Sequence, residues 1–590
     1  GADGRRSRPD GEPSVSPDRN PHLSLKLPVW RTRFVLVCLL TGFGAMGVRA
    51  MYLQGMDHEG LQAEGAKRYA RVLEMPANRG MITDRHGEPL AVSTPVDTVA
   101  VTLGRGEISA DQRAELATML GLPRKDLDAK LAPGRRGVVF LKRQMPPEQA
   151  QRVLALDVPG LFLQREHRRY YPAGDVLSHV LGMTDVEERG TEGIERELDD
   201  RLAGRPGSRR VIKDLKGRVV EDLEHVRAPQ QGQDIALSID LKLQYLAYRE
   251  LRQAVATHKA KAGSVVVLDA QSGEILALAN VPTYNPNNRS RYDPGRARNR
   301  ALVDLFEPGS TLKPFTIAAA LESGRYTPDT VIATAGGALP MGRHVIRDVH
   351  AAGDLTVAQV LQKSSNVGTA RMALSLPPRD LWAVLSSSGF GAVPNAGFPG
   401  EAGGRLRDPK TWKPIEQATM SYGHGISVSL MQLARAYSIF CTDGELLPVT
   451  LLKRAEAVEG TPVLQPKTAR AMRDMLQLVT QPGGTAPKAQ VAGYRVAGKT
   501  GTAHKLVNGA YAPDKYASSF VGLAPASAPR LIVAVLIDEP SAGQHYGGQV
   551  AAPVASAVLS GALRVLSVPP DLPVPRTPIP EVLDPVGEEV

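Results

Sequence analysis

The chain has 590 residues, of which 42% are hydrophobic and 22% are charged, so its length predicts several folded domains and at least one large core. The formal charge of +10 is spread along the sequence, without the long Lys/Arg runs of nucleic-acid-binding segments, and a solubilising surface explains it at least as well as an anionic partner. Two cysteines, Cys38 and Cys441, and the lack of an HExxH pattern exclude a disulfide framework, a Cys-rich metal site and the common zinc-hydrolase site.

The N-terminal part contains an apolar segment at residues 34–53, interrupted only by Arg49. A bilayer core needs roughly 20 such residues as a helix, so we predict a transmembrane anchor. The tail of residues 1–33 carries seven basic and four acidic residues and is predicted to be disordered and cytoplasmic, with the body exported. A cleaved signal peptide is the alternative, because residues 45–47 offer a possible cleavage site.

Residues 57–227 form a mixed α/β block with short predicted elements. We expect helices over 59–74 and 111–120 and a strand over 98–103. The polar stretch APQQGQD at 228–234 marks a boundary before the second block.

The second block, residues 235–565, begins and ends with strand patterns and has helical segments between them. It opens with a strand, a helix from Leu241 to about His258, and an apolar hairpin over 263–282. Further strands are expected within 495–505, 516–525 and 530–540. This order predicts an α+β fold, a mixed sheet with helices on its faces. The tail of residues 566–590 has seven prolines between Pro569 and Pro585, which exclude a helix or a sheet interior.

The stretch GYRVAGKTG at residues 493–501 matches the P-loop pattern of nucleotide hydrolases. A P-loop leads directly into a helix, but Gly501, Pro513 and the Asn508-Gly509 pair would break that helix. Asn-Gly is instead a hairpin turn signal. We therefore reject the nucleotide interpretation and place Lys499-Thr500-Gly501 in a strand.

Three short motifs occur once each and in this order: Ser310-Thr311-Leu312-Lys313, Ser364-Ser365-Asn366 and Lys499-Thr500-Gly501. Alone, they are typical of a helix cap, a turn and an edge strand. Together they are the known signature of penicillin-binding proteins and serine β-lactamases.

The chemistry of the first motif follows from its position before a helix. Pro314 is tolerated only in a first turn, so Ser310 lies at the N-terminus, where free N–H groups favour the charge of an attacking oxygen. Lys313 follows one turn later and is predicted to bring its amine to the Ser310 hydroxyl. A neutral lysine near pH 7 requires a pKa drop of roughly three units, about 4 kcal/mol, which burial and the cation of Lys499 can supply.

The remaining motif residues suit substrate handling. Ser364 can pass a proton to the leaving group, and Asn366 offers an amide for a substrate amide while touching the lysine of the first motif. The hydroxyls of Thr500 and Thr502, with Lys499, suit a substrate carboxylate. The backbone N–H groups of residues 310 and 502 are the predicted oxyanion hole, where one donor is worth roughly 100- to 1000-fold in rate.

Longer stretches around these motifs resemble the class B penicillin-binding proteins, and most closely the monofunctional cell-division (septal) transpeptidase, the penicillin-binding protein 3 type. They include RNRALVDLFEPGSTLKPFT, QKSSNVGTARMA, SYGHGISVSLMQLARAYS, GKTGTAHK and YGGQVAAPV. Glu307-Pro308-Gly309 before Ser310 is similar to the division branch. In the first block, NRGMITDRHGEPLA resembles the family's N-terminal pedestal domain, and the residues of the pedestal that match family positions are expected to be structural or partner-facing: Arg79, Gly80, Asp84, Arg85 and Gly87.

The resemblance implies a pedestal domain and a transpeptidase domain with an antiparallel five-stranded sheet flanked by helices. It implies that Ser310 attacks the penultimate D-Ala of a peptidoglycan stem peptide, releases the last D-Ala, and passes the acyl group to an amine of a neighbouring stem. Tyr422, Gly423 and Gly501 are implied as substrate-binding, β-lactams as inhibitors, and no cofactor. It also implies a single-pass inner-membrane protein with a periplasmic catalytic domain that meets a division-specific glycan polymerase and other divisome proteins.

Three positions depart from the family pattern: His424 stands where Tyr is frequent, His504 where Arg or Gln is commoner, and Ala555 where Phe is frequent. The last change predicts the loss of an aromatic contact to substrate. Two other functions stay open: a hydrolase of the same fold, either a β-lactamase or a D,D-carboxypeptidase, and a non-catalytic β-lactam sensor or division scaffold. Turnover of a penicillin adduct, and septation supported by Ser310→Ala, would distinguish them.

Overall fold

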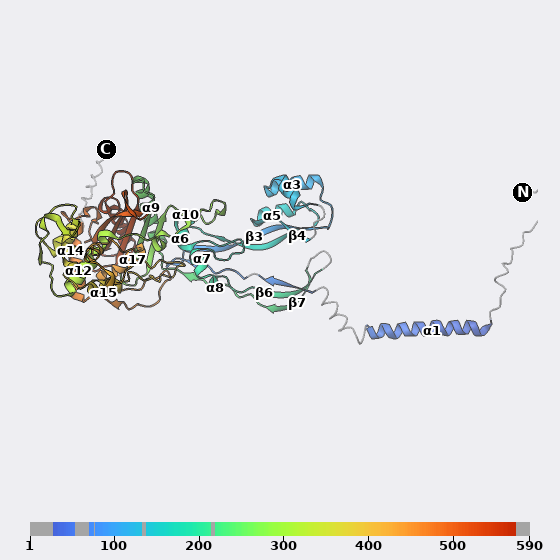
Figure 1. Ribbon diagram of the computed structural model, residues 1–590. Coiled ribbons are helices and arrows are strands. Elements are labelled where there is room, and N and C mark those ends of the chain that lie inside the picture. The colour runs from blue at the N-terminus through green and yellow to red at the C-terminus, as the bar shows by residue number, and fades with distance from the viewer. Residues whose placement is uncertain (1–27, 54–69, 76, 133–136, 214–218, 574–590) are drawn as a thin grey trace, which may run out of the picture. The chain divides into compact units, whose positions relative to one another are not determined.

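The computed structural model describes residues 28–53, 70–75, 77–132, 137–213 and 219–573 (Figure 1). These residues form two units, one comprising residues 1–75 with 207–228 and the other 76–206 with 229–590. Within the first unit, α1 (Val29–Met51) begins five residues before the predicted segment and has no buried residue. By length and composition it can cross a membrane, a property that it shares with signal sequences near an N-terminus.

The first unit also contains a three-stranded antiparallel sheet of β1 (Ala70–Met75), β6 (Gly207–Lys213) and β7 (Val219–Arg227). The helix predicted over 59–74 is wrong for residues 70–74, which belong to β1; residues 59–69 lie outside the described chain. In β1, Ala70 pairs with Ile212 and Met75 with Gly207. This pairing joins segments more than a hundred residues apart, which local periodicity cannot reveal.

The pedestal part of the second unit is built on the long strand β3 (Pro89–Leu103), which contains the predicted strand. β3 pairs antiparallel with β4 (Gly137–Met145), β5 (Leu161–Tyr170) and β2 (Ile82–Thr83), and β2 pairs in parallel with β8 (Ile235–Ala236). Helices α3 (Ala110–Leu120), α4 (Arg124–Lys130) and α5 (Pro147–Leu154) cover one end of it (Figure 1). Their apolar side chains form a separate small core.

A buried ionic cluster organises the other end of the pedestal. Arg79 and Arg169 both donate to the carboxylate of Glu195, at 2.7 and 2.6 Å, and the side chains of all three are at most 1% exposed. Arg79 also binds Asp199 at 2.6 Å. Because removal of one partner would leave a buried charge unpaired, these contacts give Arg79 a structural role. Asp84 is also buried, and its carboxylate accepts the amides of His86 and Glu88.

The catalytic part contains one antiparallel sheet of five strands in the order β10 (Ile275–Val281), β9 (Ala262–Asp269), β19 (Leu531–Asp538), β18 (Ala510–Ala524) and β17 (Ala497–Val507). This confirms the expected sheet. Every residue of β9 is buried, so both faces of the centre are covered. Helices α9 (Leu241–Thr257) and α21 (Ala552–Val565) pack together on the sheet, and α17 (Leu430–Ala436) also contacts it (Figure 1).

The helical region between the early and late strands carries the first two motifs. Its main helices are α11 (Arg300–Val303), α12 (Lys313–Glu322), α13 (Val357–Lys363), α14 (Asn366–Leu374), α15 (Pro378–Ser387), α16 (Pro414–Met420), α18 (Ser438–Cys441) and α19 (Pro466–Thr480). Phe315 of α12 contacts the rings of Phe390, Tyr437 and Phe440 at centroid distances of 5.0, 5.4 and 5.2 Å. This aromatic cluster fixes the helix that carries Lys313.

The shorter elements fill the connections. The pedestal has α6 (Ser178–Leu181), α7 (Gly193–Glu197) and α8 (Asp199–Leu202). The catalytic part has α10 (Pro294–Ala297), α20 (Gly547–Val550) and the two-stranded pairs β11 (Val331–Ile332) with β14 (Leu355–Thr356), β12 (Ala338–Met341) with β13 (His344–Arg347), and β15 (Glu445–Leu446) with β16 (Thr461–Pro462).

Candidate active site

Ser310 lies in a single 3-10 turn, Gly309–Leu312, that leads into α12. Pro314 occupies the first turn of that helix, as predicted, and Ser310 is half-buried. The turn is held from both ends: Thr311 donates its hydroxyl to the Pro308 carbonyl at 2.7 Å, and the buried phenol of Tyr437 donates to the Thr311 carbonyl at 2.7 Å. The serine therefore stands at the helix N-terminus in a fixed turn.

The three motifs meet at the hydroxyl of Ser364. Its Oγ lies 3.1 Å from the Lys313 amine and 2.9 Å from the Lys499 amine. Both lysines are fully buried, and Lys313 also donates to the Ser364 carbonyl. Within the described chain the Ser310 hydroxyl makes no hydrogen bond, so the predicted bond between Lys313 and Ser310 is replaced here by bonds to Ser364.

Burial determines the charge of the two lysines. It lowers the pKa of Lys313 well below its ordinary value, the positive charge of Lys499 lowers it further, and Asp348 opposes the shift. Burial also lowers the pKa of Lys499 to about 7. Both amines therefore lose their protons more readily than an exposed lysine does, which a general base requires.

The second motif separates two helices. Ser364 ends α13 in the left-handed conformation with φ 59°, and Ser365 caps α14 by accepting the Gly368 amide at 2.9 Å. Asp348 receives the Ser365 hydroxyl at 2.7 Å, and its other oxygen accepts the amides of Asn366 and Val367. This carboxylate fixes the backbone that presents Ser364.

Asn366 begins α14, and its side-chain amide donates to the Arg347 carbonyl at 2.9 Å. The expected contact with Lys313 is not among the hydrogen bonds of the described residues. The amide is held by backbone instead, half-buried beside the motif.

The third motif lies on β17, an edge strand, and no helix follows it directly. This confirms that the stretch is not a P-loop. A Cβ on Gly501 would lie 2.7 Å from the Pro308 carbonyl oxygen, so only glycine allows the strand to approach the serine turn this closely. Thr500 shares a hydrogen bond of 2.9 Å with Thr485, and Thr502 accepts the Gly547 amide at 3.0 Å.

Tyr422 and Gly423 flank the serine turn on another side. Gly423 has φ 89°, its carbonyl accepts the Gly309 amide at 3.2 Å, and a Cβ there would lie 2.1 Å from the Gly309 oxygen. Tyr422 is 9% exposed, and burial raises its pKa to about 12. Of the ten predicted site residues, hydrogen bonds join Lys313, Ser364 and Lys499 to one another, and Gly423 and Gly501 lie against the serine turn.

Comparison with known proteins decides the family. Residues 263–560 match the penicillin binding protein transpeptidase domain, and residues 74–237 match the penicillin-binding protein dimerisation domain. The chain belongs to the class B penicillin-binding proteins. The probable peptidoglycan D,D-transpeptidase PenA of Neisseria gonorrhoeae is 42% identical over 92% of this chain and 94% of that protein. The peptidoglycan D,D-transpeptidase FtsI of Escherichia coli is 40% identical over 92% of this chain and 93% of that protein.

Solved structures agree with this class B assignment. The transpeptidase domain of Burkholderia pseudomallei penicillin-binding protein 3, in its apo form, is 49% identical, covers 57% of this chain and 98% of its own, and has a TM-score of 0.53. A peptidoglycan synthetase from Bifidobacterium adolescentis covers 85% of this chain and 98% of its own at a TM-score of 0.68. At 24% identity the latter shows the fold alone.

The three departures from the family pattern have separate structural settings. His424 is hydrogen-bonded to Glu307 at 3.2 Å, and His504 Nδ1 lies 3.0 Å from the Ala512 carbonyl. Ala555 is fully buried on α21 within the main core. The predicted loss of an aromatic substrate contact at position 555 stays a prediction, and the alanine itself packs in the core.

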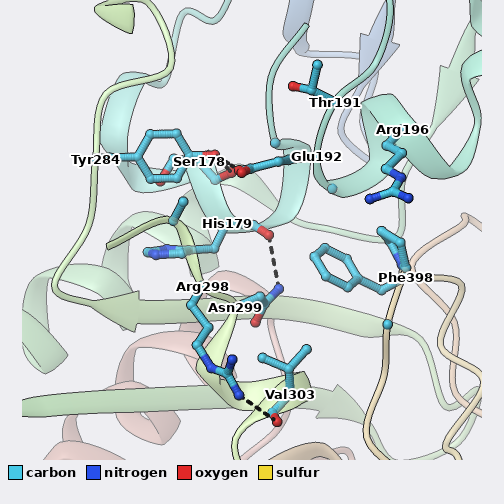
Figure 2. Close-up of a pocket in the computed structure, with 15 residues that line it drawn as sticks. Ser178, His179, Thr191, Glu192, Arg196, Tyr284, Arg298, Asn299, Val303 and Phe398 are labelled. Carbon is cyan, nitrogen blue, oxygen red and sulfur yellow. Dashed lines mark hydrogen bonds between the residues drawn. The ribbon is translucent and has the colours of Figure 1, made fainter. Parts of the chain in front are cut away.

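A pocket of about 320 Å³ lies at the junction of the pedestal and catalytic parts (Figure 2). The candidate catalytic residues, all within the described chain, are not part of its lining. Several of its polar groups are paired: Asn299 donates to the His179 carbonyl at 3.0 Å, and the Glu192 carboxylate contacts the phenols of Tyr284 and Tyr292. Burial lowers the pKa of His179 to about 4, so this imidazole is neutral at neutral pH.

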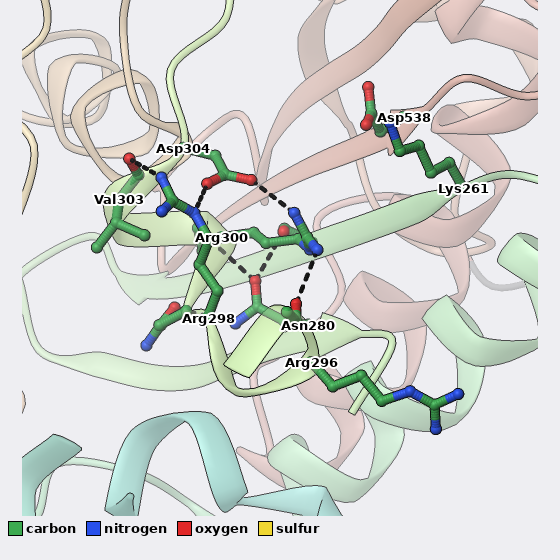
Figure 3. A network of polar contacts seen from close by, with 12 residues as sticks. Lys261, Asn280, Arg296, Arg298, Arg300, Val303, Asp304 and Asp538 are labelled. Atoms are coloured by element: carbon green, nitrogen blue, oxygen red, sulfur yellow. Dashed lines mark hydrogen bonds and ion pairs between the residues drawn. The ribbon is translucent and has the colours of Figure 1, made fainter. Parts of the chain in front are cut away.

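The segment before the serine turn is tied to β10 by a polar network (Figure 3). Arg298 and Arg300 both bind Asp304, and the Arg300 contact measures 2.9 Å. Asn280 of β10 accepts the Ala301 amide at 2.9 Å and donates to Asn299 at 3.0 Å. These contacts hold the backbone of residues 298–304 in place ahead of Ser310. They give Arg298, Asn299 and Arg300 a supporting role.

Proposed function

We propose that this class B penicillin-binding protein is a septal peptidoglycan D,D-transpeptidase that cross-links stem peptides through an acyl-enzyme on Ser310. One observation carries the proposal: two fully buried lysine amines lie within 3.1 Å of the Ser364 hydroxyl beside the Ser310 turn. The names of the PenA and FtsI relatives agree with the reaction.

In the first half-reaction, the Ser310 hydroxyl attacks the carbonyl of the penultimate D-Ala. The serine proton passes to the neutral amine of Lys313, whose lowered pKa suits it as the base. The oxygen of the tetrahedral intermediate is stabilised by the backbone N–H groups of residues 310 and 502. Collapse breaks the peptide bond, Ser364 relays a proton to the departing D-Ala amine, and an ester remains on Ser310.

In the second half-reaction, an amine of a neighbouring stem peptide attacks this ester and loses its proton to the same relay. The new amide forms the cross-link, and Ser310 regains its hydrogen. Lys499, Thr500 and Thr502 suit the terminal carboxylate of the donor peptide, because a cation and two hydroxyls along one strand can charge-assist its hydrogen bonds. β-Lactams acylate Ser310 by the same first step.

The direct test incubates the full-length chain with a stem pentapeptide that ends in D-Ala-D-Ala and a second stem peptide that carries a free side-chain amine. We expect a cross-linked dimer and one released D-Ala for each dimer, measured by mass spectrometry. Release of D-Ala with only the hydrolysed tetrapeptide would identify a carboxypeptidase-type hydrolase. Ser310→Ala should abolish both products, and if this variant still supports septation, the scaffold function is correct.

We further propose that α1 anchors the protein in the inner membrane, with the tail cytoplasmic and the catalytic part periplasmic, and that the pedestal meets a division-specific glycan polymerase. The basic tail supports this orientation. A phosphatase fused after residue 573 should be active in cells only if the body is exported. An inactive phosphatase, with full expression of the fusion, would contradict the orientation.

A further inference from the structure

Glu307 stands three residues before Ser310, and its carboxylate collects donors from two other segments. The Tyr511 phenol donates to its two oxygens at 3.2 and 3.0 Å. The Gly425 amide donates to Oε1 at 2.8 Å, and His424 Nδ1 lies 3.2 Å from Oε2. The carboxylate is 12% exposed, so these donors replace the water that burial removes.

Tyr511 belongs to the tip of the β17–β18 hairpin. It pairs with Leu506, and one further pair precedes the Asn508-Gly509 turn. Leu506 and Tyr511 are 53% and 50% exposed, so little packing holds the tip. The bond to Glu307 and an edge contact of 6.0 Å between the Tyr511 and His424 rings attach Tyr511 to the serine-turn side of the site. At the base of the tip, Lys505 binds Asp538 and Glu539 at 2.6 and 2.8 Å.

The backbone beside Glu307 is attached on the opposite flank to the loop of residues 422–428. Phe306 and Val428 exchange two amide–carbonyl bonds of 3.0 Å, and the Gly309 amide donates to Gly423. The hairpin touches the same segment twice, at Gly501 against Pro308 and at Tyr511 on Glu307. Glu307 is therefore the side chain through which the loop, the serine turn and the hairpin tip are joined.

At neutral pH the Glu307 carboxylate is charged and the Tyr511 phenol is neutral. Burial opposes ionisation of Glu307, but hydrogen bonds from His424 and the Gly425 amide outweigh it and lower the pKa of the carboxyl. Burial and the charge of Glu307 raise the pKa of Tyr511 to about 12. The phenol thus keeps its proton and the carboxylate stays charged, which is the strong form of this hydrogen bond.

We propose that Glu307 is a positioning residue for acylation: through Tyr511 it fastens the hairpin tip to the serine turn, and so keeps the strand of Lys499 and Thr502 in register with Ser310. Only the expected effect on the acylation rate rests on the proposed function. The attachment of the hairpin is a physical property that can be measured without any reaction.

The test uses the full-length chain with Tyr511→Phe and Glu307→Gln, and the matched controls Tyr245→Phe and Glu459→Gln, which are exposed positions elsewhere. Fluorescent penicillin at several concentrations gives the limiting acylation rate and the half-saturating concentration. Limited digestion with trypsin follows cleavage after Lys505 and Lys515 in the hairpin. We expect Glu307→Gln to lower the limiting rate about tenfold with little change in half-saturation, because a charged hydrogen bond is lost.

We expect Tyr511→Phe to speed hairpin cleavage about five- to tenfold. It should also slow acylation, as Glu307→Gln does, while both controls behave as wild type. The double variant should be no slower than Glu307→Gln, since that change already weakens the bond to Tyr511. Unchanged acylation and unchanged digestion in Tyr511→Phe would overturn the proposal, even if Glu307→Gln fails to fold. A wild-type chain that takes no label would refute the proposed function, and the digestion would still decide the attachment.

Discussion

The amine of Lys313 lies 3.1 Å from the hydroxyl of Ser364, a residue 51 positions later in the sequence. Both groups sit between the serine turn and the strand that carries Lys499, whose amine is 2.9 Å from the same hydroxyl. Both amines are screened from solvent, and the positive charge of Lys499 lowers the pKa of Lys313. The pH dependence of acylation should therefore report on this arrangement.

Removal of the Lys499 charge should move the pH profile of acylation. In Lys499→Met, the pKa of Lys313 rises because a neighbouring cation is gone. The base is then neutral only at higher pH, so the acidic limb of the limiting acylation rate should shift to higher pH. Asp348→Asn should shift it the other way. The acylation rate is measured with fluorescent penicillin from pH 5 to 10, with the exposed variant Lys467→Met as the control. If the acidic limb stays in place in both variants, as it should in the control, the influence of these charges on Lys313 is refuted.

Stability should also depend on the buried amine of Lys499. Its pKa is about 7 in the folded chain against 10.5 as the ordinary value, so between these values the unfolded chain binds more protons and stability rises with pH. The penalty is full below pH 7 and on the order of 5 kcal/mol at most. The difference in unfolding free energy between Lys499→Met and wild type, measured in urea, should shrink from pH 7 to 10. A constant difference would show that the amine is not buried in this way.

Asp348 should matter for stability through the helix that follows Ser364. Asp348→Ala removes the acceptor of the Ser365 hydroxyl and of two amides at the start of α14. We expect a loss of about 1–2 kcal/mol, the cost of an N-terminal cap, and slower acylation because the Ser364 backbone is released. Asp354→Ala, at an exposed position, is the control for urea unfolding. Equal stability of the two variants would contradict the assigned role.

Gly423 should tolerate no side chain. A Cβ at this position would lie 2.1 Å from the Gly309 oxygen, whereas the same atom at Gly397, which has a similar φ of 87°, meets nothing within 4 Å. Gly397→Ala should cost about 1–2 kcal/mol for its left-handed backbone. Gly423→Ala should lose more and should no longer be labelled by penicillin, because the serine turn must move. Thermal unfolding and labelling of both variants check this, and equal effects would show that the turn yields freely.

Much of the catalytic part could be predicted because its signals are local. The hairpin of β9 and β10 and helix α9 follow from apolar patterns, the β17–β18 hairpin from its Asn-Gly pair, and the turn before α12 from Pro314. The residues of the three motifs were also found, since each motif is a short stretch. The segment of residues 70–74 was mistaken for helix because its partner strand comes more than a hundred residues later.

The supporting contacts could not be predicted, since no sequence spacing connects them. Asp348 precedes its partner Ser365 by 17 residues, and Tyr511 joins Glu307 across 204 positions. The burial of Ala555 in the core also has no local sequence signal, because it depends on how α21 packs. A residue's type reveals what chemistry it can do, but the partner that gives it a role is set by the tertiary fold.

The most direct measurement of the central claim is the mass of the penicillin-labelled chain and of its tryptic peptides, compared between wild type and Ser310→Ala. We expect one adduct per chain, on the peptide that contains Ser310, and no adduct in the variant. An adduct on any other residue, or labelling of Ser310→Ala at the wild-type rate, would contradict the account.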